Sequence, residues 1–141
     1  MRVVLDTNIL VSALMSPTGT AAIIYRAWHE KRFTLLTCTE LLDELRAALR
    51  KPAIAARIRP YKAGELVNDL KTLAESVKGL PQVRRSPDPT DDFILALCEA
   101  GKAQYLVTGD QAGLLALERH KSTRIVSARA FAALMAHRER V

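Results

Sequence analysis

The 141-residue chain has no apolar run that approaches the roughly 18 to 20 residues of a membrane-spanning helix. It also opens without a basic segment followed by an apolar stretch, because Asp6 and Asn8 interrupt the one candidate for a secretory signal. Hydrophobic residues make up 49% and charged residues 26%, which is typical of a water-soluble globular protein. We therefore expect a single domain over residues 1–141, in the cytoplasm and with no membrane partner.

Cysteine and histidine are scarce. Cys38 and Cys98 lie in apolar surroundings without CxxC spacing, so we expect reduced core residues and no disulfide framework. The three histidines (His29, His120 and His137) are isolated in the sequence, and we expect them at the surface. This scarcity argues against a zinc site.

Positive charge is in excess. The net charge is +6 and the isoelectric point is near 9.7, which favours association with polyanions such as nucleic acid. The basic residues are scattered, apart from a late group that includes Arg124 and Arg129. We predict that these two arginines contact RNA, although a solvated face or a partner subunit would also account for them.

Segments with strand and helix character alternate along the chain. We expect strands at 2–5, 33–38, 105–107 and 124–126, with a short edge strand at 82–84, and helices at 8–14, 19–31, 39–50, 54–78, 91–100, 111–120 and 128–138. Strands separated by helices pair in parallel through right-handed crossovers. The fold class is therefore α/β.

Two of the expected buried strands end in aspartates. The first strand runs into Asp6-Thr7-Asn8, and Tyr105-Leu106-Val107 runs into Thr108-Gly109-Asp110. Ligands of α/β proteins bind beyond the carboxyl ends of parallel strands, so both aspartates stand where a site is expected. Helix capping is the alternative, since aspartate is also a preferred N-cap residue.

Further acids lie on two helices between these strands. Glu44 is the acid nearest the apolar face of helix 39–50, whereas Asp91 and Asp92 flank the apolar sector of the next acidic helix from opposite sides. Periodicity alone does not choose between these two aspartates. Clustered carboxylates favour Mg²⁺ or Mn²⁺, and such a centre suits phosphodiester hydrolysis.

The order of these motifs resembles the PIN-domain family. The resemblance is carried by Leu5-Asp6-Thr7-Asn8, by Glu44-Leu45 in a helix, by Asp88-Pro89-Thr90-Asp91-Asp92 before Ile94-Leu95-Ala96, and by Val107-Thr108-Gly109-Asp110. It extends from Arg2 to about Val126 and is strongest for the bacterial, VapC-like toxins of type II toxin–antitoxin systems. It implies a three-layer α/β/α sandwich around a central, mostly parallel sheet of four to five strands.

The resemblance also implies roles for individual residues. Asp6, Glu44, Asp92 and Asp110 match the four catalytic, Mg²⁺- or Mn²⁺-binding acids, with Asp91 as the fallback for the third. Asn8 and Thr108 match polar residues that support the site, and Asp88 matches a supporting residue of the Asp-Pro segment.

The implied function is metal-dependent cleavage of RNA by a toxin that a small antitoxin protein holds inactive. Such toxins are similar to homodimers whose paired active sites face a shared groove, into which the antitoxin lays basic or apolar side chains. Two alternatives stay open. One is an RNA-processing nuclease without an antitoxin, and the other is a non-catalytic protein-interaction module, which would bind no metal.

Overall fold

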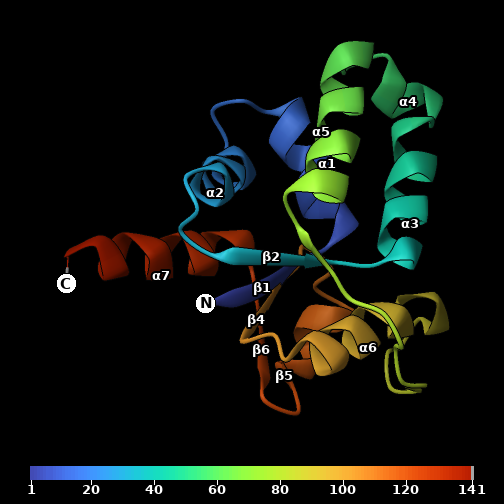
Figure 1. Ribbon diagram of the computed structural model, residues 1–141, viewed down its shortest axis with the longest axis vertical. Coiled ribbons are helices and arrows are strands. Elements are labelled where there is room, and N and C mark those ends of the chain that lie inside the picture. Colours follow the sequence, from blue (N-terminus) through green and yellow to red (C-terminus); the bar gives the residue numbers. More distant parts are fainter. Residues whose placement is uncertain (141) are drawn as a thin grey trace.

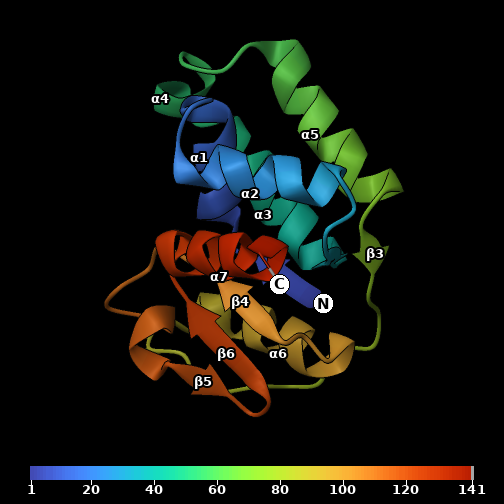
Figure 2. The ribbon, with the colours of Figure 1, turned by 90° about the vertical axis from the view of Figure 1, so that its left-hand side faces the viewer.

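A six-stranded, mostly parallel sheet forms the centre of the computed structural model, which describes residues 1–140 (Figures 1 and 2). The strands are β1 (Arg2–Leu5), β2 (Thr34–Thr37), β3 (Glu75–Ser76), β4 (Tyr105–Val107), β5 (Arg119–His120) and β6 (Thr123–Val126). Their spatial order is β3-β2-β1-β4-β6-β5, and only β5 runs antiparallel to its neighbour. The protein has an α/β fold, as predicted, with one strand more than expected.

Helices cover both faces of this sheet. They are α1 (Thr7–Met15), α2 (Thr20–His29), α3 (Thr39–Leu49), α4 (Pro52–Ala55), α5 (Pro60–Thr72), α6 (Asp92–Gly101) and α7 (Ala128–Arg140), with 3₁₀ turns η1 (Pro89–Asp91) and η2 (Leu114–Leu117). Figures 1 and 2 show α6 on one face and α1, α2 and α7 on the other, where α3 and α5 extend outward. This is the predicted three-layer arrangement.

Apolar side chains from both helical layers meet on the central strands. Val3 and Val4 of β1 and Leu106 of β4 are fully buried. They continue into a core that includes Leu5, Leu10, Ile24, Leu35, Leu36, Leu41, Leu45, Leu66, Leu70, Ile94, Leu95 and Phe131. Because Val3, Val4 and Leu5 of β1 are buried, with helices on both faces of the sheet, these three residues form an uninterrupted apolar run.

The middle of the chain differs from the predicted helix 54–78. Arg59, which precedes Pro60, is extended (φ −65°, ψ 137°), as steric contact with a following proline ring requires. The proline then occupies the first turn of α5, where its missing N–H matters least. The helix ends at Thr72, and residues 75–76 form β3 beside β2. Residues 75–76 therefore pair with β2 as a strand, although the apolar periodicity of residues 54–78 predicted a helix.

Two further elements were predicted wrongly. Residues 82–84 form no strand, because β3 takes the edge position next to β2. The predicted helix 111–120 is instead η2 followed by β5, with Glu118 between them at a φ of 61°. The ladder between β5 and β6, in which His120 lies opposite Thr123, outweighs the helical preference of that segment.

His120 is buried rather than at the surface. Arg85 donates to its Nδ1 at 2.9 Å, and its Nε2 lies 3.0 Å from the Glu99 carboxylate.

Cys38 and Cys98 are free and buried, as predicted, and burial raises their thiol pKa values to about 11 and about 12.

No single helix of residues 1–140 is long and apolar enough to cross a membrane, although the bent pair α1 and α2 passes that test by length and composition.

Candidate active site

The sheet has a topological switch point between β1 and β4. Strands β2 and β3 lie on one side of β1, whereas β4 and β6 lie on the other. In the parallel pairing Leu5 is opposite Val107, so both strands end at the same level of the sheet. A crevice beyond the carboxyl ends of such strands is where α/β proteins bind ligands. Asp6 follows the first strand, and Thr108-Gly109-Asp110 follow the second.

Four acids from four separate segments line one pocket of about 640 Å³ at this point. Asp6 follows β1, Glu44 lies on α3, Asp91 is the last residue of η1, and Asp110 comes after β4. Thr7, Asn8 and Lys51 also line it. The structure thus places three of the four expected acids, Asp6, Glu44 and Asp110, at one pocket, and the fallback for the third acid, Asp91, lines it in place of Asp92.

Asp92 was expected as the third acid and points elsewhere. Its carboxylate accepts hydrogen bonds from the backbone N–H groups of Arg85 and Ser86, at 3.1 and 2.7 Å. These bonds fix the loop that precedes η1 at the start of α6. Helical periodicity did not distinguish the two aspartates. Asp91, the last residue of the 3₁₀ turn η1, lines the pocket in place of Asp92.

Asp6 is fixed by a dense set of hydrogen bonds. It is the N-cap residue of α1, and its carboxylate accepts from the Thr7 backbone N–H at 2.7 Å. The Thr108 hydroxyl donates to it at 2.7 Å, and the Asn8 amide donates at 3.2 Å. The Asp6 side chain therefore both caps α1 and lines the pocket. The side chains of Asn8 and Thr108, which were expected to support the site, thus both contact Asp6.

Asp110 is held in a similar way. Its carboxylate accepts from the backbone N–H groups of Gly113 and Leu114 at 3.1 and 3.3 Å. Its own N–H donates to the Thr108 hydroxyl at 3.1 Å, so one threonine links the two aspartates. A β-carbon on Gly113 would overlap the Asp110 carboxylate. The glycine is thus required for this carboxylate to lie where it does, and nothing in the sequence pattern had indicated that role.

Electrostatic repulsion is evident in the pocket. Burial, with the charges of Glu44 and Asp110, raises the pKa of Asp6, although the Thr108 and Thr7 hydrogen bonds oppose this. Burial and the charges of neighbouring acids, Asp6 first, raise the pKa of Asp91 to about 6. Each of these carboxyl groups is therefore harder to ionise than an isolated one.

The donor set fits a hard divalent cation. Carboxylate oxygens are the ligands that Mg²⁺ and Mn²⁺ prefer. The carboxylates of Glu44 and Asp91 make no hydrogen bond or ion pair with any described residue, and the buried Thr7 hydroxyl in the pocket wall has no partner there either. Within residues 1–140, no three His, Cys, Asp or Glu side chains already stand at metal-binding separations. The acids line the pocket without converging, as mutually repelling charges do.

The other predicted residues lie outside this pocket. The exposed Asp88 caps η1, where it accepts from the Thr90 N–H at 3.0 Å and from the Thr90 hydroxyl at 2.8 Å. Arg124 pairs with Tyr105 at the beginning of β4, away from the strand ends that carry the acids. Arg129 is exposed in the first turns of α7. That these two arginines bind RNA stays a prediction.

The fold and the pocket define an α/β protein with an acidic site at its switch point. The family model described as PIN domain matches residues 2–112, and the chain belongs to the PIN-domain family. A search of curated proteins gave no significant match. PIN domains are generally metal-dependent nucleases, and the acidic pocket lies within the matched residues.

Proposed function

We propose that the protein is a Mg²⁺- or Mn²⁺-dependent endoribonuclease whose active site is the pocket of Asp6, Glu44, Asp91 and Asp110. The observation that carries this proposal is the gathering of four acids from four distant segments around one pocket at the switch point. Structural acids would be expected to make capping hydrogen bonds. Asp91 is the N-cap residue of α6, yet its carboxylate makes no capping hydrogen bond, and neither it nor the Glu44 carboxylate has a hydrogen-bond or ion-pair partner among the described residues.

The four carboxylates would hold the cation, with Asp6 and Asp110 already fixed and Glu44 and Asp91 free to adjust. A bound divalent ion neutralises charge on the scissile phosphate and activates water for attack on phosphorus. The Thr108 hydroxyl group fixes the positions of Asp6 and Asp110 relative to each other through its two hydrogen bonds. Lys51 lines the same pocket without an ion pair to any described residue, so its ammonium group is free to contact a phosphate.

The proposal is tested by cleavage of labelled single-stranded RNA with Mg²⁺, with Mn²⁺ and with EDTA. We expect cleavage only with metal, and loss of cleavage in Asp6→Asn and Glu44→Gln. Glu40→Gln is the matched control, because Glu40 is an exposed acid on the same helix. Calorimetric titration with Mn²⁺ gives a second readout. Metal binding with no cleavage of any RNA would contradict the nuclease assignment, and no metal binding would favour an interaction module.

We further propose that this nuclease is the VapC-like toxin of a type II toxin–antitoxin pair, which acts in the cytoplasm as a homodimer. The order of the acid motifs supports the toxin role, and reduced cysteines support the compartment. Induced expression in bacteria should arrest growth, and the Asp6→Asn variant should not. An active nuclease that leaves growth unaffected would favour an RNA-processing enzyme. Light scattering of the purified protein tests the dimer.

A further inference from the structure

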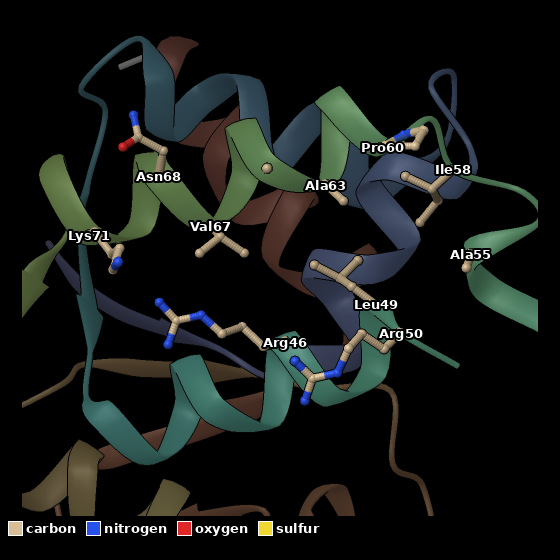
Figure 3. Close-up of a pocket in the computed structure, with 11 residues that line it drawn as sticks. Arg46, Leu49, Arg50, Ala55, Ile58, Pro60, Ala63, Val67, Asn68 and Lys71 are labelled. Carbon is tan, nitrogen blue, oxygen red and sulfur yellow. The ribbon is translucent and has the colours of Figure 1, made fainter. Parts of the chain in front are cut away.

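Helix α3 and the following turn into α4 form a wall with two chemically different sides. Glu44, Ala48 and Lys51 face the acidic pocket. The residues beside them in sequence, Arg46, Leu49 and Arg50, face a separate groove of about 540 Å³ between α3 and α5. Figure 3 shows this groove, with Arg46 extending into the space between the two helices and Val67 pointing in from α5.

Among the residues that the structure describes, three cations and no acid line this groove. Arg50 and Lys71 are exposed and make no ion pair with any described residue. Arg46 reaches Asp43 at 3.7 Å, a long and solvent-exposed contact that contributes little. The positive charge in the groove is therefore available to a ligand, and it favours a polyanion.

The floor of the groove adds a second kind of contact. Leu49, Ile58 and Val67 provide apolar surface to it. Cations along a groove hold nucleic-acid phosphates, and apolar surface between them accepts the faces of unpaired bases.

The groove and the acidic pocket meet at the end of α3. Arg50 lines the groove and the next residue, Lys51, lines the pocket. The same division recurs in α4, where Ile54 lines the pocket and Ala55 lines the groove. A polyanion with one phosphate at the acids thus meets two successive cations at this crossing.

We propose that the α3–α5 groove binds the single-stranded RNA substrate on one side of the scissile phosphate, with the strand crossing at Lys51 and Arg50. Arg46 and Lys71 then neutralise the phosphates that follow. This inference rests on the proposed nuclease function and adds to it the path of the substrate. It also explains how a pocket of four acids retains a polyanion, since cations directly beside it offset the repulsion.

Binding is measured by fluorescence anisotropy with labelled single-stranded RNA, in an Asp6→Asn background with EDTA, so that no cleavage occurs. In Arg50→Gln/Lys71→Gln we expect RNA affinity to fall about tenfold or more. The slope of log affinity against log salt should fall by about 1.4, because each of the two phosphates that is no longer neutralised accounts for about 0.7. Glutamine is a good helix former, and the thermal midpoint checks that both variants fold.

The matched control is Arg57→Gln/Lys62→Gln, which removes the same charge from exposed residues that line a different hollow. A clearly smaller loss of affinity in this control supports the groove. An equal loss in both variants would show a general effect of net charge and would overturn the proposal. Unchanged RNA affinity, with a labelled peptide of alternating Glu and Leu losing affinity instead, would overturn it in favour of an acidic protein partner.

A parallel cleavage assay in the wild-type background separates this inference from the proposed function. If the wild-type protein cleaves RNA and Arg50→Gln/Lys71→Gln raises KM more than it lowers kcat, both are supported. If the wild-type protein cleaves and the groove variant has an unchanged KM, the groove proposal fails alone. If the wild-type protein cleaves no RNA with either metal, the nuclease assignment fails, and the inference that rests on it falls with it.

Discussion

Asp91 and Asp92 are adjacent and chemically identical, yet the structure gives them opposite surroundings. Asp91 lines the acidic pocket and its carboxylate has no hydrogen-bonding partner among the described residues, whereas the Asp92 carboxylate accepts from two backbone N–H groups of the preceding loop. A carboxylate without partners among like charges is available to a cation. A carboxylate that satisfies backbone donors is part of the scaffold. We therefore expect Asp91 to contribute to metal binding and Asp92 to contribute to stability.

We expect Asp91→Asn to lower RNA cleavage about 100-fold or more, because several kcal/mol of metal-derived stabilisation correspond to two or more decades in rate. Its thermal midpoint should stay the same or rise, because one repelling charge is removed. Asp92→Ala should lower the free energy of unfolding by about 1 kcal/mol, because its hydrogen bonds to the loop are removed. Cleavage assays and urea unfolding of both variants check this, and the reverse pattern would restore Asp92 as the third acid.

Gly113 is predicted to position Asp110 without touching substrate. In Gly113→Ala the new methyl group would displace the Asp110 carboxylate, which can rotate away because it is the end of a side chain. We expect Mn²⁺ affinity, measured by calorimetry, to fall about tenfold or more, as it does when groups that orient metal ligands are removed. The thermal midpoint should change little.

Gly109→Ala is the control for this variant. A β-carbon at that position makes an ordinary contact with Asn8, and its backbone has no unusual φ. If both alanine variants lost Mn²⁺ affinity equally, the effect would belong to the loop as a whole rather than to the position of Asp110.

At the scale of whole elements, α5 illustrates how tertiary contacts limit a helical pattern. Leu66 and Leu70 are buried in the core, and helical spacing would place Leu73 on the same face. Leu73 is instead the C-cap residue and is 59% exposed, because the chain leaves the helix after Thr72 to pair β3 with β2. Burial therefore ends one turn earlier than periodicity indicates.

The two leucines should consequently differ in their effect on stability. Leu70→Ala removes a side chain that is 1% exposed and should lower the free energy of unfolding by about 2 to 5 kcal/mol. Leu73→Ala should change it by less than about 0.5 kcal/mol. Urea unfolding with a common slope for both variants gives these values. Comparable losses of stability would mean that residues 73–78 pack as a continuation of the helix.

At the scale of the molecule, the pocket makes the metal-free protein sensitive to pH. The pKa of Asp91 rises from 3.8 to about 6 on folding, and that of Asp6 also rises. The folded state therefore holds these protons more tightly than the unfolded chain does. Their contribution to stability is fully present below about pH 4, and for Asp91 it is lost as the pH rises through 6.

Urea midpoints at a series of pH values, measured with EDTA, check this expectation. The stability of Asp91→Asn relative to the wild-type protein should increase between about pH 4 and pH 6.5 and then level off. Asp43→Asn, which removes an exposed acid of α3 that does not line the pocket, is the matched control. A constant difference between Asp91→Asn and wild type across this range would show that Asp91 is not held among like charges.

The sequence by itself determined the alternation of strands and helices, the two strand-terminal aspartates and Glu44 on its helix. These features depend on local chemistry, since apolar runs form buried strands and polar residues follow where the strands end. The tertiary structure decided whether Asp91 or Asp92 enters the pocket, because the Asp92 carboxylate bonds to the loop before η1, whereas Asp91, the last residue of that 3₁₀ turn, lines the pocket.

Long-range contacts also account for the elements that the sequence pattern predicted wrongly. Pairing with β2 converted residues 75–76 from helix to strand, and pairing with β6 did the same for residues 119–120. The roles of Gly113, Lys51 and the α3–α5 groove likewise became visible only in three dimensions, because each depends on atoms from segments that fold together. Local sequence sets propensity, whereas the partners available in space select among the conformations that propensity allows.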